Sequence, residues 1–132
     1  MTTMKNGFDR DWLLRIALAS VFLFHGIGKF TGAGGIGGFA QMTGLPVFVA
    51  FLVGFAEVAG GLGMIIGGFG KPLITRLAGA AIIPVMLGAI FMVHWGRWSF
   101  TPSETHPMGG MEFQVVLALI AAWFLLAPRK QV

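Results

Sequence analysis

Cysteine is absent from the sequence, and charged side chains are scarce. Without cysteine, the chain can form neither a disulfide framework nor a thiolate metal site. Any redox chemistry must therefore use a bound cofactor or a substrate that carries its own electrons. Charged residues make up 11% of the 132 residues, against about 25% in an ordinary soluble domain. So few charges cannot cover the large surface of a small soluble protein, and the composition disfavours one.

The chain is instead rich in apolar and small residues, with 56% hydrophobic side chains and 21 glycines. A bilayer core about 30 Å thick needs roughly 20 apolar residues per helix, and close-packed membrane helices favour small residues. Four segments meet this requirement, and the last of them is short. We therefore predict an all-α fold, a transmembrane four-helix bundle formed by one membrane domain of residues 1–132. The predicted spans are residues 12–30, 46–69, 76–95 and 111–127.

The basic residues lie in short clusters between the apolar segments, which fits topology signals better than a nucleic-acid surface. The loop after the first span has no charge, and the loop after the third has one arginine, Arg97. Apart from Lys29, the other basic side chains lie on the opposite side of the predicted spans. Lys5, Arg10 and Arg15 lie before or at the start of the first span. Lys71 and Arg76 lie between the second and third, and Arg129 and Lys130 follow the fourth. The positive-inside rule then places both termini in the cytoplasm of a multi-pass protein, which we expect in a bacterial inner (plasma) membrane. This basic rim is expected to attract anionic lipid.

Small residues and one proline predict local features of the helices and of one loop. The pairs Gly28–Gly32 and Gly63–Gly67 have the spacing at which membrane helices approach closely. Pro84 removes one helix hydrogen bond and predicts a kink near the middle of the third span. The run GAGGIGG at residues 32–38 lacks the lysine and hydroxyl residue of a phosphate-binding loop. It predicts a flexible outer loop or lid.

Five ionisable residues fall within or beside the predicted spans. Glu57 is near the middle of the second, where a charge costs about 2.5–3.5 kcal/mol and usually faces the bundle interior with a partner. His25 and Lys29 are four residues apart and share one helix face. His94 ends the third span and Glu112 opens the fourth, so alternating helices bring the group together in the outer half of the bilayer. Three of them also have a structural interpretation: a protonated Glu57 between helices, a Lys29 that extends toward water, and an interfacial His94.

These residue types suit a quinone, which needs hydrogen-bond donors at its carbonyl oxygens and a proton source when it is reduced. We predict that His25 and Lys29 bind the headgroup, with Glu57, His94 and Glu112 as the catalytic proton path. Phenylalanines would line the slot for the ring and tail, although such residues more often serve packing. The predicted lining consists of Phe22 and Phe55, with Phe30, Phe51 and Phe91 as further candidates.

Other functions fit the same residues. His25 and His94 could be the two axial ligands of a haem in a four-helix bundle. A metal held by both histidines, Glu57 and Glu112 has no motif of diagnostic spacing, and we predict no metal site. The abundance of small residues also fits a non-catalytic structural or assembly subunit of a larger membrane complex. We expect lipid, quinone and other protein subunits as partners, and no nucleic acid.

The order of short motifs resembles the DoxX family of small four-helix membrane proteins. These motifs are FLFHGIGKF at residues 22–30, GLP at 44–46, EVAGGLGMIIGGF at 57–69 and GGMEF at 109–113. The resemblance covers nearly the whole chain. It implies membrane-associated redox work, since similar proteins include a subunit of a thiosulfate:quinone oxidoreductase and proteins associated with thiol-stress and superoxide defence.

Overall fold

A computed structural model describes residues 9–127, and this part of the chain is helical and contains no strand. Within residues 9–127, five α-helices and one π-helical turn, η1, follow one another. They are α1 (Asp11–Thr31), α2 (Gly35–Thr43), α3 (Val47–Gly67), α4 (Pro72–Ala89), η1 (Ile90–His94) and α5 (Glu112–Leu125). The predicted all-α class is therefore confirmed. Three of the basic residues on which the predicted topology depends lie outside the described residues: Lys5, Arg129 and Lys130.

Three of these helical segments are long and apolar enough to cross a membrane: α1, α3 and the continuous segment Pro72–His94, which joins α4 to η1. The fourth, α5, is apolar but has only 14 residues. At 1.5 Å per residue it is about 21 Å long. Three of the predicted spans thus have the expected length, and the fourth is a shorter helix.

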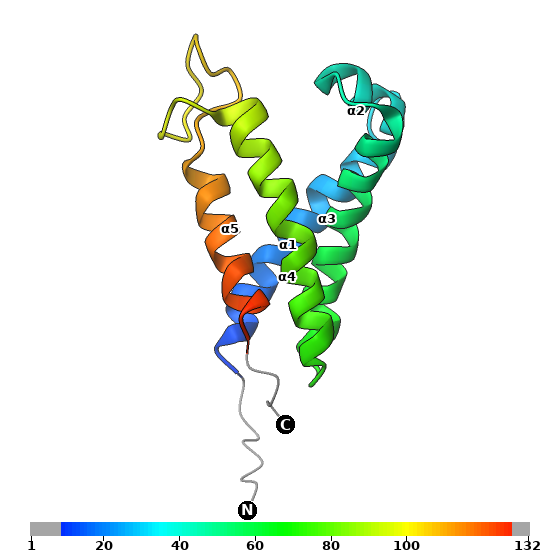
Figure 1. The fold of residues 1–132 in the computed structure, drawn as a ribbon, viewed down its shortest axis with the longest axis vertical. Coiled ribbons are helices and arrows are strands. Elements are labelled where there is room, and N and C mark those ends of the chain that lie inside the picture. Colours follow the sequence, from blue (N-terminus) through cyan, green and yellow to red (C-terminus); the bar gives the residue numbers. More distant parts are fainter. Residues whose placement is uncertain (1–8, 128–132) are drawn as a thin grey trace, which may run out of the picture.

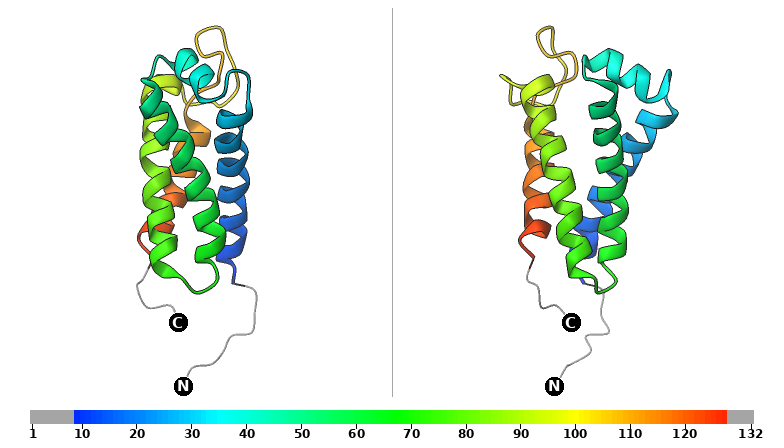
Figure 2. Two further views of the ribbon diagram at one scale, coloured as in Figure 1. Left: turned by 90° about the vertical axis from the view of Figure 1, so that its right-hand side faces the viewer. Right: turned by 45° about the vertical axis from the view of Figure 1, so that its right-hand side comes forward.

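The long helices alternate in direction and form an elongated bundle (Figure 1). The turn between α3 and α4 lies at one end, together with the start of α1 and the end of α5, and we call it the Lys71 end. The opposite end, which we call the α2 end, carries α2 and the loop of residues 95–111, hereafter the outer loop (Figure 2). Toward the α2 end, the pair α4 and α5 diverges from α1 and α3, while α2 packs on α3.

The core lies where the helices meet below this divergence, and it joins α1, α3, α4 and α5. Phe22, Met64 and Phe124 are among its fully buried side chains. Because most of the surface of such a bundle faces lipid, large apolar side chains remain exposed on every long helix, for example Phe24 and Leu119.

Glycines let α3 approach both of its neighbours closely. A methyl group at Gly61 would lie 2.8 Å from Leu23 Cγ on α1, and one at Gly63 would lie 2.8 Å from Ala78 Cβ on α4. Such distances are shorter than van der Waals contact, so these positions accept only glycine without a shift of the helices. Gly28 differs from the prediction, because a methyl group there would meet nothing within 4 Å.

The glycine-rich stretch differs from the predicted flexible loop, and the kink at Pro84 stays a prediction. Residues 35–43 of the glycine-rich stretch form the helix α2 instead of a flexible loop. The helix is bounded by Gly34 and Gly44, whose φ angles of 76° and 74° lie in the left-handed region that glycine enters without strain. The α-helix also continues through Pro84 to Ala89, and the irregular backbone begins only at the π-helical turn from Ile90. Membrane helices tolerate proline because neighbouring groups satisfy the freed backbone.

Candidate functional site

An ion pair joins α1 to the middle of α3 inside the bundle. Lys29 Nζ lies 2.7 Å from Glu57 Oε2, a distance typical of a charge-assisted hydrogen bond. The side chain of Lys29 is 16% exposed and that of Glu57 is 5% exposed. The prediction that Glu57 faces the interior and has a partner is therefore confirmed, and the partner is Lys29.

The direction of the Lys29 side chain distinguishes this pair from an ordinary interfacial lysine. Lys29 lies in the last turn of α1, at the α2 end, where its ammonium could reach water. It instead points back along the helix, as helical side chains do, and meets a carboxylate from the middle of α3. The charge is thus held inside the bundle by its partner, and the alternative of a lysine that extends to water does not apply.

Glycine and an aromatic ring shape the surroundings of this pair. A methyl group at Gly26 would lie 2.9 Å from Glu57 Cβ, so glycine lets α1 approach α3 at the level of the carboxylate. From α2, Phe39 places its ring 4.9 Å from Lys29 Nζ, within the range of a cation–π contact. The helix α2 therefore covers the ion pair from the α2 end. The sequence indicated no role for Phe39, since only the fold of the glycine-rich stretch brings it to Lys29.

His25 lies one turn before Lys29 on the same face of α1, as predicted. Its ring is exposed and contacts the ring of Phe24 edge-on, with 5.5 Å between the centroids. Within residues 9–127, the imidazole has no hydrogen bond. The ring thus lies on the exposed side of this helix face, whereas the Lys29 ammonium points into the bundle toward Glu57.

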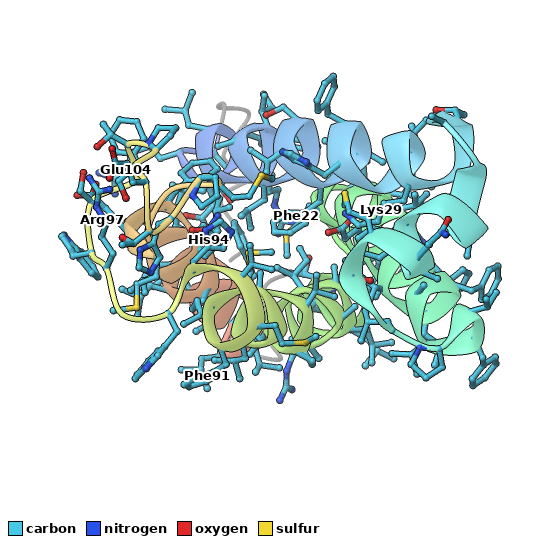
Figure 3. The ribbon with its side chains drawn as sticks, turned by 90° about the horizontal axis from the view of Figure 1, so that it is seen from above. Phe22, Lys29, Phe91, His94, Arg97 and Glu104 are labelled. Atoms are coloured by element: carbon cyan, nitrogen blue, oxygen red, sulfur yellow. The ribbon has the colours of Figure 1, made fainter. Side chains whose placement is uncertain are left out.

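His94 and Glu112 belong to a different set of contacts, at the outer loop. His94 is buried at the end of η1, and its Nδ1 lies 2.9 Å from the carbonyl oxygen of Gly109. Glu112 accepts a hydrogen bond of 3.4 Å from the amide of Phe100. Seen from the α2 end, Lys29 lies beside α1 and α3, whereas His94 lies beside α4 and the outer loop (Figure 3). The five predicted residues therefore do not form one cluster, and the proton path through His94 and Glu112 stays a prediction.

The outer loop is ordered by hydrogen bonds between its two halves. The amides of Gly110, Met111 and Glu112 donate to the carbonyl oxygens of Ser99, Arg97 and Trp98, respectively, at 2.7–2.9 Å. These bonds satisfy the backbone just before the short helix α5, which a lipid environment requires. His94 contributes to the same network by binding Gly109. The π-helical turn thus places a histidine where it anchors the loop.

The predicted phenylalanines lie in three different settings. Phe22 is buried in the core, so it cannot line an open slot. Phe30, Phe51 and Phe55 form a ladder on the outer surface of α1 and α3, with successive centroids 5.9 and 6.2 Å apart. Phe91 is exposed beside Trp95 on the other side of the molecule.

A shallow apolar groove of about 380 Å³ runs between α3 and α4 on the side of the α2 end. Phe55 and Ala56 line it, as does Val53, which lies four residues before Glu57 and so on the same side of α3. The groove lies on the outer surface of the bundle, since Leu52 and Phe55 are exposed, and Glu57 and Lys29 are not among its lining residues. Its lining consists of Val49, Leu52, Val53, Phe55, Ala56, Ala81, Pro84 and Val85.

The four residues considered as metal ligands are not brought together in the described chain. Within residues 9–127, no three histidine, aspartate or glutamate side chains come together as ligands. The alternative of a metal bound by His25, Glu57, His94 and Glu112 therefore has no structural basis. The haem and assembly alternatives stay predictions.

The role of Arg15 in the structure was not predicted from the sequence beyond a topology signal. Its Nη1 donates a hydrogen bond of 2.8 Å to the carbonyl oxygen of Met64 on α3. Its guanidinium carbon also lies 4.8 Å from the centre of the Phe124 ring on α5. One arginine inside the first span thus joins three helices, and its position within an apolar segment was the available signal.

Comparisons with known proteins agree with the earlier resemblance. The DoxX family model matches residues 11–95, from the start of α1 to the residue after η1. A protein of Bacillus subtilis (strain 168), named "Putative oxidoreductase CatD", is 32% identical over 118 residues, which cover 89% of this chain and 78% of that protein. No solved structure matches the chain. The match spans most of the helical bundle, and the chain belongs to the DoxX family of multi-pass membrane proteins.

Proposed function

We propose that this protein is the quinone-binding membrane subunit of an oxidoreductase, and that Lys29 and Glu57 form its headgroup site. The observation that carries the proposal is the ion pair inside an apolar bundle. A pair of apolar side chains would usually stabilise the same contact as well or better. Charged groups kept within a membrane therefore indicate a function more often than a structural need.

The donor geometry fits a quinone carbonyl. The Lys29 ammonium has three protons, and one of them is donated to Glu57 Oε2. Within residues 9–127, no other hydrogen-bond acceptor is bound to Nζ. A carbonyl oxygen of the ligand can take a second proton, while the imidazole of His25, on the same helix face, is the candidate donor to the other carbonyl.

The apolar groove between α3 and α4 offers a place for the isoprenoid tail. It lies on the outer surface of the bundle, where it would open toward lipid, and its lining residue Val53 is one helical turn from Glu57 on α3. In this proposal, the tail of a quinone bound at the ion pair passes Val53 to reach the groove. Phe55 keeps its predicted part as a lining residue of this groove.

The proposed chemistry is proton delivery to a quinone that is reduced by a partner. Reduction of a quinone to a quinol takes up two electrons and two protons. The electrons would come from a partner subunit that carries a redox cofactor, since this chain has no cysteine. The carboxyl group of Glu57 and the ammonium group of Lys29 would hold and pass protons at the carbonyl oxygens. The name of the Bacillus subtilis relative supports an oxidoreductase role.

We place four spans across a bacterial inner membrane, with both termini in the cytoplasm and the outer loop on the opposite side. The alternating helices support this arrangement, as does the excess of basic residues at the Lys71 end, where Arg10, Arg15, Lys71 and Arg76 outnumber Asp9 and Asp11. The short helix α5 would be completed by the hydrogen-bonded outer loop or by local thinning of the bilayer.

Quinone binding to the purified protein in lipid nanodiscs tests the proposal. We expect Lys29→Gln and Glu57→Gln each to raise the Kd for a short-tailed quinone at least tenfold, since a hydrogen bond to a charged group contributes about 1.5–3 kcal/mol. Lys71→Gln is the matched control, because it removes the same charge from an exposed position at the other end. An unchanged Kd in both ion-pair variants would refute the headgroup site.

The groove is tested in the same assay by the length of the tail. Ala56→Phe should fill the groove and weaken binding of a long-tailed quinone more than binding of a tailless one. Equal effects on the two ligands would leave the headgroup site in place and refute the tail site.

A further inference from the structure

A second hollow, distinct from the proposed quinone site, lies at the Lys71 end between α4 and α5. We call it the α4–α5 hollow, and its volume is about 500 Å³. Its walls are apolar except for one charged side chain, Arg76. The lining residues are Pro72, Leu73, Arg76, Leu77, Ala80 and Leu125.

One nitrogen of the Arg76 guanidinium donates a hydrogen bond to the protein, and the other two are available as donors to a ligand. Its Nε donates a hydrogen bond of 3.3 Å to the carbonyl oxygen of Leu125, at the end of α5. Within residues 9–127, its two terminal nitrogens have no hydrogen-bond partner. A guanidinium in this state can bind two oxygens of one phosphate group side by side.

The depth of Arg76 matches the boundary between lipid headgroups and acyl chains. It is the fifth residue of α4, so it lies about 6 Å along the helix from the first residue, Pro72. Leu73 and Leu77, on the same helix, are 68% and 60% exposed. An apolar chain in the hollow would cover these side chains while its headgroup stayed at the level of the guanidinium.

The charge around the hollow favours an anionic occupant. Lys71 precedes α4 and is exposed at the same end of the bundle as Arg10. In the sequence, Arg129 and Lys130 follow α5, although they lie outside the described residues. Within residues 9–127, no acidic residue lines the hollow. These basic side chains would attract a zwitterionic headgroup less strongly than an anionic one.

We propose that the α4–α5 hollow is a binding site for one anionic phospholipid of the leaflet at the Lys71 end. Arg76 binds the phosphate, and Leu73, Leu77 and Ala80 contact the first part of an acyl chain. Because Arg76 also holds Leu125, the bound lipid joins the beginning of α4 to the end of α5. The site is independent of the ion pair at Lys29 and of any quinone.

The test measures lipid retained by the purified protein. The full chain is exchanged into nanodiscs of phosphatidylcholine and phosphatidylglycerol and then transferred to detergent, and retained lipids are quantified by mass spectrometry. The wild type should retain about one phosphatidylglycerol per chain. Retention should fall at least tenfold in Arg76→Gln and in Ala80→Phe, which fills the hollow but keeps the charge. Arg10→Gln, which removes a charge at the same end away from the hollow, should match the wild type.

Several results would overturn the proposal. One is equal retention of phosphatidylglycerol in the wild type, Arg76→Gln and Ala80→Phe. Another is equal retention of the two lipids, which would remove the preference for an anion. If deletion of residues 128–132 were needed before any lipid bound, the end of this chain would be the occupant instead. Displacement of the lipid by millimolar inorganic phosphate would identify a site for the free anion.

Discussion

At the level of single residues, the ion pair between Lys29 and Glu57 allows stability to be separated from function. Removal of one partner leaves a buried charge without compensation, whereas removal of both leaves an apolar contact between α1 and α3. A purely structural pair would therefore be replaceable by two apolar side chains with no loss of activity. A functional pair would not.

We predict that the single substitution destabilises the protein much more than the double substitution. Lys29→Met should destabilise the protein by about 3–5 kcal/mol, because Glu57 loses its only partner in the described chain. Lys29→Met combined with Glu57→Leu should recover most of this loss. Denaturant unfolding in mixed micelles measures both, with Lys71→Met as the exposed control. A double variant as unstable as the single one would contradict this account of the pair.

The sequence identified Glu57 as the residue that needs an explanation, but it could not identify the partner. Several ionisable residues were predicted at a similar depth, and helix register gives the depth of a residue but not which helices are neighbours. The structure pairs Glu57 with Lys29 and binds His94 to Gly109. Which groups come together depends on the close contact between α1 and α3 at Gly26.

At the level of the helices, α3 is the central element of the bundle, because it packs closely against both α1 and α4. Glycines line its faces toward α1 and α4, and Glu57 lies between these two faces. The predicted close approach at Gly63 and Gly67 is confirmed, because methyl groups there would meet Ala78 and Thr75. The small residues therefore serve contacts within this chain, which accounts for much of the glycine content without a further subunit.

Two glycine substitutions should differ in sign. A methyl group at Gly67 would lie 2.8 Å from the backbone nitrogen of Thr75, which cannot move without shifting α4, so Gly67→Ala should destabilise by about 1–3 kcal/mol. Gly28→Ala meets nothing within 4 Å and should be neutral or stabilising by up to about 1 kcal/mol. Thermal unfolding in detergent compares them. Equal destabilisation by both would show that the helices do not pack as described.

The long helices could be predicted from apolar length alone, whereas α2 could not. Residues 35–43 include three glycines, which have poor helix propensity, so the local sequence predicts a loop. The helix forms because Ala40 is buried and Ile36 packs against α3 at Gly54. This is a tertiary contact that local sequence does not reveal, and it is the one that brings Phe39 to Lys29.

At the level of the whole molecule, the bundle has two chemically different ends. The Lys71 end carries Arg10, Lys71 and Arg76. The α2 end carries α2, the hydrogen-bonded outer loop and, just beneath them, the ion pair. The proposed quinone site and the proposed lipid site thus lie toward opposite leaflets, and each can be changed without the other.

The absence of cysteine makes the proposed orientation directly testable, because any thiol label must report the introduced position. In intact cells, Glu104→Cys in the outer loop should react with a membrane-impermeant maleimide, and Lys71→Cys should react only after lysis. Both positions are exposed. The reverse pattern would invert the topology. Reaction of both positions in intact cells would place residues 71 and 104 on the same side of the membrane, so the chain could not cross it once between them.

The most direct test of the central claim is photo-crosslinking with an azidoquinone in native membranes, followed by peptide mapping. We predict saturable labelling of residues near the ion pair, on α1 around Lys29 and on α2 around Phe39 or α3 around Glu57. An excess of unlabelled quinone should compete with this labelling. Saturable labelling confined to α4, α5 or the outer loop, or no saturable labelling, would contradict the assignment of Lys29 and Glu57 as the quinone site.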